Sequence, residues 1–360
     1  MIDFVHAADL HLDSPITFLP QDKALKLRRA FRDTLTDIIE YANNHRVALL
    51  LLSGDLFDKA EASYDTAVFL ARALERFSGK VFIAPGNHDP YTSASPYRSV
   101  NFSDNVHIFT KNTPEAVVLP ELNCTVYGAA FNSSDCASQL LSGFCAQGDQ
   151  VKIGVFHGQT GDPYSAYNPI MAQDIAESGL DYLALGHVHS FSGMLTAGKT
   201  SYAYPGCPQG RGFDEPGQKG VIHGRIENGQ VDCKFVNTGT FTFSTPQLDI
   251  TGMEAGQIMK AVLFELDNPA ASLCKITLTG HHENPDILAG LEHALQERLF
   301  YTRIVDKSRV KTDIWQLTQE DTLTGQFMKI MLDGYENAPE DGKELIEAAA
   351  KFGLEALKSE

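Results

Sequence analysis

The first ninety residues alternate between two spacings of hydrophobic positions. Short apolar runs of strand length occupy residues 2–7, 48–52 and 80–84. Between them, residues 24–44 and 64–77 carry apolar side chains three or four positions apart, which is the spacing of an amphipathic helix. A strand–helix–strand–helix–strand order with short connections predicts a layer of parallel strands flanked by helices.

Further apolar runs of strand length continue this pattern toward the middle of the chain. They lie at residues 116–119, 125–129, 152–156, 182–185, 201–204, 221–225 and 233–237. The stretch 238–247 that follows is rich in Thr and Ser, and we interpret it as the exit from a first domain.

The remaining sequence predicts a small module and a helical tail. Strands are expected at 248–250, 274–279 and 302–310, with helices from Met253 and over 285–299. From Gln319 onward the chain holds ten acidic and four basic residues, which predicts acidic helices over 322–332 and 342–357, broken at Gly334 and Pro339. We therefore expect a first domain over 1–240, a small α/β capping domain over 241–318, and an acidic helical tail over 319–360.

Composition narrows the class of protein. The chain has 360 residues, too many for one core, with 43% hydrophobic and 21% charged residues, as in globular proteins. Its six cysteines form no C-x-x-C pair, which disfavours a disulfide framework and a zinc finger. The N-terminus lacks a signal-peptide pattern and the apolar runs are too short to cross a bilayer, so we expect a cytoplasmic protein with no membrane association.

Polar side chains of the types that bind metals follow five of the predicted strands. They are Asp9 and His11; Asp55 and Asp58; Asn87, His88 and Asp89; His157; and His187 and His189. Because the carboxyl ends of strands form the ligand-binding edge of an open α/β sheet, we expect these side chains to converge. Gly54, Gly86 and Gly186 precede them, and glycine permits tight turns and close backbone approach.

The expected ligands are carboxylates, imidazoles and one amide, without a thiolate, and this mixture suits Mn²⁺, Fe²⁺ or Zn²⁺. Seven of these ten residues are plausible metal ligands. Seven are too many for one ion, so two ions that share a bridging carboxylate are expected. Paired ions of this kind lie about 3.5–4 Å apart and stabilise the attacking and leaving oxygens of a phosphoryl transfer. His187 and His189 lie on one side of an extended segment, where they can serve neighbouring ions.

These motifs, in this order, resemble the calcineurin-like metallophosphoesterases over residues 1 to about 240. The matching patterns are D-x-H, G-D-x-x-D, G-N-H-D, a single His and G-H-x-H. The resemblance implies a β-sandwich flanked by helices. The opening HAADLHLDSP, the segment YPGCPQGRGFDEPGQKG and the small module beyond it look most like the bacterial DNA-repair exonuclease branch, the SbcD-like and YhaO-like nucleases.

The resemblance also implies roles for individual residues. One ion would be held by Asp9, His11, Asp55 and His189, and the other by Asp55, Asn87, His157 and His187, with Mn²⁺ as the expected metal. A metal-bridging hydroxide would attack phosphorus, and His88 would stabilise the phosphate or protonate the leaving oxygen. Asp58 would orient His88, although some relatives carry a histidine at that position. Independently of the resemblance, the glycine-rich setting of Arg211 in PGCPQGRG suits contact with the substrate, with an ordinary surface loop as the alternative.

The expected function is a two-metal phosphodiesterase that hydrolyses DNA, as repair exonucleases do. A phosphodiesterase for cyclic nucleotides or dinucleotides is the main alternative, and the net charge of −17 favours it because that charge opposes broad attraction to DNA. A phosphoprotein phosphatase is disfavoured, since that class has Arg-Gly where this chain has Lys59-Ala60. A metal-loaded scaffold for an ATPase is a further alternative.

Several segments suggest binding partners. In the nuclease branch, the region after the second module docks onto an SMC-like ATPase, and the apolar positions Phe327, Ile330 and Met331 suit this or packing on the chain itself. Residues 90–97 contain tyrosines that would line a homodimer contact or pack within their loop. Residues 23–32 hold five basic side chains, which would contact a DNA backbone or form the solvated face of a helix.

Overall fold

The structure is a computed structural model, and it describes all residues except 61, 283–287, 289, 311–313 and 359–360. The chain divides into two compact units. The first unit comprises Met1–Pro246, Glu265–Ile276 and Ala294–Arg303, and the second comprises Gln247–Phe264, Thr277–His293 and Ile304–Glu360. The division into 1–240, 241–318 and 319–360 stays a prediction.

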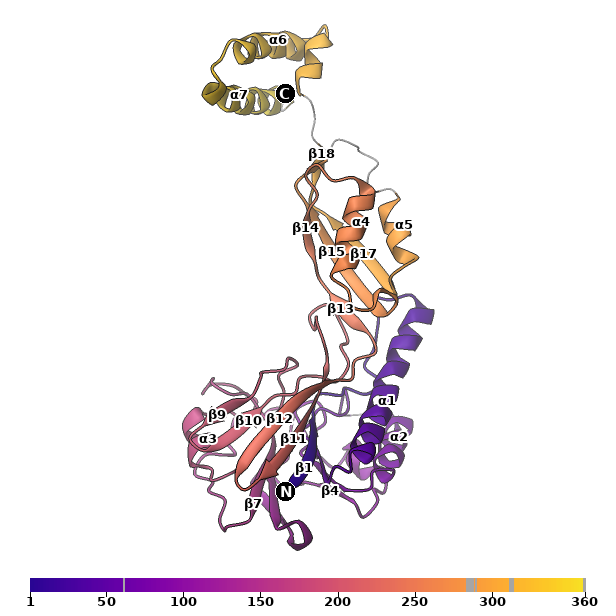
Figure 1. Ribbon diagram of the computed structural model, residues 1–360, viewed down its shortest axis with the longest axis vertical. Coiled ribbons are helices and arrows are strands. Elements are labelled where there is room, and N and C mark those ends of the chain that lie inside the picture. Colours follow the sequence, from indigo (N-terminus) through magenta and orange to yellow (C-terminus); the bar gives the residue numbers. More distant parts are fainter. Residues whose placement is uncertain (61, 283–287, 289, 311–313, 359–360) are drawn as a thin grey trace. The chain divides into compact units, whose positions relative to one another are not determined.

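A six-stranded mixed sheet contains the predicted parallel layer (Figure 1). The strand order is β12-β11-β1-β2-β3-β4. The parallel strands are β1 (Ile2–Ala7), β2 (Leu49–Leu52), β3 (Lys80–Ile83) and β4 (Val106–Ile108), and the antiparallel ones are β11 (Gly220–Glu227) and β12 (Gln230–Asn237). The short strand β4 has no apolar run of its own and was not predicted.

A second six-stranded sheet packs against the first. Its order is β5-β6-β7-β8-β10-β9, and its strands are β5 (Glu115–Leu119), β6 (Cys124–Gly128), β7 (Val151–His157), β8 (Tyr182–Gly186), β9 (Leu195–Ala197) and β10 (Thr200–Ala203). One apolar cluster joins the two inner faces, with Phe4 and Phe82 from the first sheet and Ile153 and Val155 from the second. This packing of two sheets confirms the predicted β-sandwich.

Helices cover the outer faces of both sheets. The helices α1 (Gln21–Asn44) and α2 (Tyr64–Glu75) bury their apolar faces, including Phe31 and Leu70, against the first sheet. The short helix α3 (Ala172–Glu177) buries Ile175 against side chains of the second sheet. With six residues, α3 is too short to show a helical period, so it was not predicted. The fold of the first unit is therefore an α/β sandwich flanked by helices.

The chain after residue 240 contains the elements of the expected α/β module. The strand β15 (Ser272–Thr279) pairs in parallel with β13 (Thr242–Ser244) and with β14 (Gln247–Asp249), and it also pairs with β17 (Tyr301–Asp306). The other elements are α4 (Ala255–Phe264), α5 (Leu291–Gln296), and the paired strands β16 (His281–His282) and β18 (Arg309–Val310).

Two of the predicted elements in this segment differ from the structure or lie partly outside the described residues. The strand predicted over 302–310 is present as two strands, β17 and β18. It is interrupted at residues 307 and 308, where the Asp306 carboxylate accepts hydrogen bonds from the amide and hydroxyl of Ser308. The helix predicted over 285–299 lies partly outside the described residues. Within them, its centre forms α5.

Two long helices end the second unit. They are α6 (Leu323–Glu336) and α7 (Glu340–Lys358), and they pack through Met328, Ala350 and Leu354. The predicted break at Gly334 is wrong, since α6 continues to Glu336; a glycine inside a helix costs only about 1 kcal/mol. Short 3₁₀ segments lie at Pro96–Arg98, Pro120–Leu122, Pro269–Ala271 and Ile314–Gln319. Among the described residues, no helix has the length and apolar character needed to cross a membrane.

Candidate metal centre

The seven predicted metal ligands gather at the carboxyl ends of five strands, in both sheets of the first unit. Asp9 and His11 follow β1, Asp55 follows β2, Asn87 follows β3, His157 ends β7, and His187 and His189 follow β8. Parallel strands bring these ends to one edge of each sheet, and the packing of the two sheets brings the edges together.

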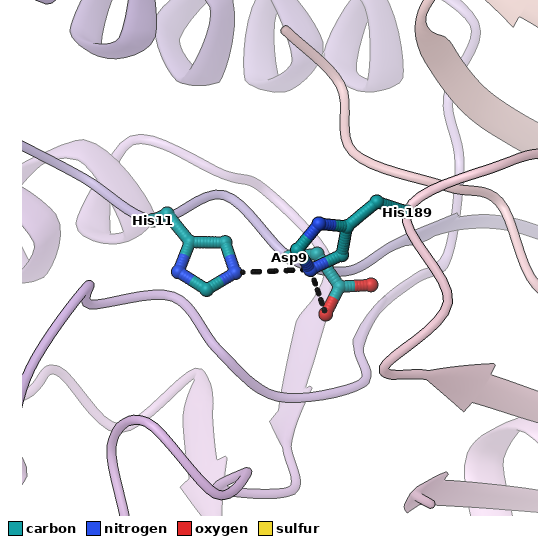
Figure 2. Close-up of side chains that lie close together, drawn as sticks. All are labelled: Asp9, His11 and His189. Carbon is teal, nitrogen blue, oxygen red and sulfur yellow. Dashed lines mark hydrogen bonds and ion pairs between the residues drawn. The ribbon is translucent and has the colours of Figure 1, made fainter. Parts of the chain in front are cut away.

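One group of ligands consists of Asp9, His11 and His189, together with Asp55. The Nε2 atoms of His11 and His189 lie 3.3 Å apart, and His189 Nε2 lies 3.8 Å from Asp9 Oδ1. In Figure 2 the two imidazole rings meet beside the Asp9 carboxylate. His11 Nε2 is also 3.9 Å from Asp55 Oδ2. Three ligand atoms, from Asp9, His11 and His189, therefore lie within 4.8 Å of one another, with Asp55 beside His11.

A second group consists of Asn87, His157 and His187, again with Asp55. Asn87 Oδ1 lies 2.9 Å from His157 Nε2 and 3.2 Å from His187 Nδ1. Asp55 Oδ2 lies 3.4 Å from His157 Nε2. The same carboxylate oxygen is thus close to an imidazole of each group, which is the position that a bridging ligand would take.

The electrostatics of these groups fit bound cations. Asp9, His11, Asp55 and His157 are almost fully buried. Burial, together with the charge of Asp55, raises the pKa of Asp9. Burial lowers the pKa of His11 and of His157 to about 4 in each case, so both rings are neutral near pH 7. Buried carboxylates beside neutral imidazoles are costly unless cations compensate their charge, and this donor set is suited to divalent metal ions.

Further side chains hold the ligand imidazoles in orientation. His11 Nδ1 lies 3.4 Å from Asp58 Oδ1, and His189 Nδ1 lies 2.7 Å from Glu215 Oε1. His157 Nδ1 donates to the main-chain carbonyl of Ser53 over 2.8 Å. Partners behind metal-binding histidines fix the tautomer and orient the ring.

Glu215 is a functional residue that sequence reasoning missed. It is 4% exposed, and besides contacting His189 it accepts hydrogen bonds from the amide, Nε and Nη2 of Arg211. Burial opposes ionisation of Glu215, but the hydrogen bonds from His189 and Arg211 outweigh it and hold the pKa of this carboxyl well below its usual range. A carboxylate four residues after an arginine in the glycine-rich stretch 204–220 was the available signal.

Several ligands have backbone conformations that non-glycine residues rarely adopt. The φ angles are 54° at Asp9, 42° at His11, 53° at Asp55 and 111° at His187. Each such residue costs about 1–3 kcal/mol, and the surrounding structure must impose it. Main-chain hydrogen bonds do so here, from the Asp9 amide to the Gly54 carbonyl and from the His11 amide to the Asp55 carbonyl, each 3.0 Å long.

Asp89 holds two of the ligand loops together rather than contacting the ligand positions. Its buried carboxylate accepts hydrogen bonds from the amides of Gly86 and Leu56, both 2.7 Å long, and from the Tyr97 hydroxyl. A Cβ atom at Gly86 would overlap the Asp55 carboxylate, so this position requires glycine, as its placement before the ligands predicts. Tyr97, one of the tyrosines considered for a dimer contact, is only 3% exposed.

His88 is exposed, unlike the ligands around it. Its ring packs edge-on against the ring of His11, with 4.8 Å between centroids, and its amide donates to Asp55 Oδ1. His88 contacts Asp58 as expected, but through the main chain of Asp58 and not through its carboxylate. The distance from His88 Nδ1 to the main-chain oxygen of Asp58 is 3.0 Å. Position and exposure suit His88 to contact a substrate phosphate.

The Asp58 carboxylate instead belongs to the support of the first ligand group. It accepts a hydrogen bond from Ser14 Oγ and lies 3.3 Å from Arg211 Nη1. Burial acts to raise the pKa of Asp58, but its contacts with His11, Ser14 and Arg211 prevail and lower it to about 2. Arg211 is half-buried between Asp58 and Glu215. Its Nη2 atom lies 3.0 Å from His189 Nδ1. Its role in substrate binding stays a prediction.

Residues 2–191 match the family model described as calcineurin-like phosphoesterase, which covers more than half of the chain. The chain belongs to this family. It is also similar to the "Uncharacterized metallophosphoesterase YhaO" of Bacillus subtilis (strain 168), with 29% identity over 262 residues, or 69% of this chain. The chain spans 64% of the length of that relative. Among solved structures, it is similar to a dimetal phosphatase from Danio rerio, with 12% identity and a TM-score of 0.43, over 66% of this chain and 96% of that one.

The matched family is named for the hydrolysis of phosphoester bonds. All seven predicted ligands and His88 lie within the matched residues. Ligand atoms lie close together in two sets, Asp9 with His11 and His189, and Asp9 with Asp55 and His157, as a binuclear metal site requires. Arg211 and Glu215 lie beyond residue 191. The two residues that contact His189 from behind therefore lie outside the part of the chain that matches the family model.

Proposed function

We propose that this phosphoesterase hydrolyses phosphodiester bonds and that DNA is its substrate. The choice of a phosphodiester over a phosphomonoester rests on the ion pairs that Arg211 makes. This guanidinium lies beside the ligand His189, but it is paired with Glu215 at 2.7 Å and with Asp58 at 3.3 Å. A phosphomonoester carries close to two negative charges near pH 7 and a diester carries one. A centre whose adjacent cation is already neutralised favours the diester.

The residues of the centre have different roles in such a reaction. The two bound ions, for which we propose Mn²⁺, would supply Lewis-acid stabilisation of the charge that develops on the phosphate. The seven predicted ligands would hold those ions, while His88 would contact the substrate phosphate from the exposed side and donate a proton to the leaving oxygen. The contact of His88 Nδ1 with the main-chain oxygen of Asp58 and the hydrogen bond from the His88 amide to Asp55 Oδ1 fix the position of His88.

The choice of DNA is supported by the sequence likeness of the opening HAADLHLDSP and of residues 204–220 to bacterial repair nucleases. The basic residues of α1 support it less strongly. Arg32 donates to Asp13 and to Asp65, Arg29 contacts Asp33, and Lys23 lies over the ring of Phe300. Contacts within the protein thus occupy three of the five basic side chains in residues 23–32.

A second candidate, a phosphodiesterase for cyclic nucleotides or dinucleotides, is favoured by the net charge of −17. A small substrate needs no extended cationic surface, so that charge would not impede its binding. The same metal chemistry serves both substrates, and only their size and shape distinguish them.

The test is hydrolysis by metal-stripped protein after addition of Mn²⁺. The substrates are linear duplex DNA, single-stranded DNA and a panel of cyclic nucleotides and dinucleotides, with His88→Ala and Asp55→Asn as controls. DNA cleavage that both variants lose supports the proposal. Cleavage of the small diesters with DNA left intact would assign the second candidate, and hydrolysis of monoesters alone would contradict both.

A role as a scaffold for an SMC-like ATPase is compatible with the surface of the C-terminal helices. Leu323 and Ile330 on α6 and Leu345 and Phe352 on α7 are 70–76% exposed. In each helix the two residues are seven positions apart, so they share a face. Co-purification with a coexpressed ATPase of that class tests this role, and Asp55→Asn separates docking from hydrolysis.

A further inference from the structure

Aromatic side chains lie on the loops that follow His157 and His189. The ring of Tyr167 packs against the ligand His187, with 4.9 Å between centroids. Phe191 follows the ligand His189 by two residues, and an extended chain of that length spans at most about 7 Å. Tyr164 lies on the same loop as Tyr167. We call the exposed pair Phe191 and Tyr164 the aromatic rim.

Phe191 is exposed yet held in a fixed orientation. Its ring stacks on Phe235 of β12, with centroids 4.7 Å apart and an angle of 26° between the ring planes. Even so, 40% of Phe191 remains accessible to solvent. An isolated surface phenylalanine would be free to change rotamer, whereas this one presents a supported flat surface. Such a surface is suited to stack with a planar ligand.

Tyr164 lies near the tip of a loop whose base is firmly closed. The amide of Gln159 donates to the carbonyl of Tyr167 over 2.8 Å, and Asn168 Nδ2 donates to the carbonyl of the ligand His157, also over 2.8 Å. Tyr164 itself is 94% exposed. The loop therefore keeps its attachment to the centre while it presents an aromatic ring to solvent.

Charge gives the protein little attraction for a phosphate backbone. Its net charge is −17, and the guanidinium groups of Arg211 and Arg32 are paired with carboxylates. Affinity for a nucleic acid must then come from another source. Stacking of bases on aromatic rings is one that depends little on charge, and each stacked base contributes about tenfold in affinity.

We propose that the aromatic rim binds unpaired nucleobases of a nucleic acid whose backbone lies at the metal centre. The inference rests on the proposed function for the choice of nucleic acid as substrate. Bases inside a duplex are already stacked on their neighbours, so the rim selects single strands and frayed ends. Phe191, beside His189, stacks the base nearest the scissile phosphate, and Tyr164 stacks a base further along the strand.

The test is equilibrium binding, which does not require hydrolysis. A fluorescently labelled single-stranded oligothymidylate and an abasic oligomer of the same length, both with hydrolysis-resistant phosphorothioate linkages, are titrated with the full-length, metal-loaded protein. Phe191→Ala and Tyr164→Ala are each expected to bind oligothymidylate about tenfold more weakly and to bind the abasic oligomer as the wild type does. Phe191→Trp, which keeps a stacking ring, is expected to retain the wild-type affinity.

Val118→Ala is the matched control, because Val118 is 63% exposed and lies at the end of β5 opposite the metal centre. Equal losses on both oligomers, or no loss on either, would overturn the aromatic rim. Hydrolysis of DNA in Mn²⁺ is measured separately on the same proteins. Base-dependent binding without any cleavage of DNA would refute the proposed function alone, and cleavage with binding that ignores the bases would refute the rim alone.

Discussion

The two ligand groups of the metal centre differ in what lies behind their imidazoles. In the group of Asp9, His11 and His189, a carboxylate backs each ring, Asp58 at 3.4 Å from His11 and Glu215 at 2.7 Å from His189. We call this the carboxylate-backed group. A carboxylate behind an imidazole increases its basicity as a metal ligand, and it also adds negative charge near the ion.

In the other group, a neutral oxygen lies behind His157, the main-chain carbonyl of Ser53. The predicted ligand Asn87, which lies between His157 and His187, is itself an uncharged amide. We call this the carbonyl-backed group. Asp55 is shared between the groups, so it does not distinguish them. Because the number of charged groups tunes metal affinity, we expect the carboxylate-backed group to bind its ion more tightly.

The largest effect is expected from Asp55→Asn, which removes the element common to both groups. Both ions should bind more weakly, and hydrolysis should fall on the order of a thousandfold, since metal stabilisation of the transition state is worth several kcal/mol. Calorimetric titration with Mn²⁺ and the rate of phosphodiester hydrolysis measure the two effects. Asp149→Asn, at an exposed carboxylate, is the control. Loss of a single ion would show that Asp55 belongs to one group only.

Glu215→Gln should separate the groups. The variant keeps the size of the side chain but removes the charge behind His189, so affinity in the carboxylate-backed group should fall about 10- to 100-fold. The carbonyl-backed group should be little affected. A titration that resolves two classes of Mn²⁺ site tests this. Equal weakening of both classes would mean that Glu215 acts through the general field of the site and not through His189.

The ligands could be predicted from sequence because they follow directly from local patterns. The apolar runs before Asp9, Asp55 and His187 identify β1, β2 and β8 as strands, and each ligand comes within a few residues of a strand end. Parallel strands then bring the ligands of each sheet to one edge, and the packing of the two sheets brings the two edges together. Local spacing identifies the ligands, and the resemblance to a sandwich fold supplies the second step.

The supports behind the ligands could not be predicted in this way. Glu215 meets His189 across 26 residues, and the partner of His157 is a main-chain carbonyl, which no residue type announces. Asp58 was expected beside His88, yet its carboxylate faces His11 because the main-chain oxygen already serves His88. Such contacts depend on tertiary packing and on backbone direction, which local spacing does not determine.

Beneath the carbonyl-backed group, His6 should make stability depend on pH. Its Nδ1 accepts from the Tyr182 hydroxyl, and its Nε2 lies 3.1 Å from the Leu185 carbonyl and 3.2 Å from Ser53 Oγ. Burial lowers the pKa of His6 to about 3, with the contact to Leu185 opposing this only in part. The folded state therefore holds the ring neutral, while the unfolded chain takes up a proton below about pH 6.5. Its contribution is complete above that pH and is lost as pH falls toward 3.

At about pH 5 the loss due to His6 amounts to about 2 kcal/mol of the free energy of unfolding. The measurement is urea denaturation of metal-free protein at about pH 7 and pH 5, for the wild type and for His6→Gln. The variant should lose less stability than the wild type over that range by this amount. His45→Gln, at an exposed histidine, should behave as the wild type. Identical pH dependence in wild type and His6→Gln would show that His6 is not the buried neutral group.

The smallest expected effect would reduce the difference between the groups instead of enlarging it. Asn87→Asp adds one negative charge beside His157 and His187 with little change in shape. If charge explains the weaker affinity of the carbonyl-backed group, that affinity should rise about tenfold. Mn²⁺ titration measures the change, and Asn101→Asp, at an exposed asparagine, gives the effect of net charge alone. An unchanged or lower affinity would instead assign the difference to the geometry of the two groups, because the added charge would then have been present without consequence.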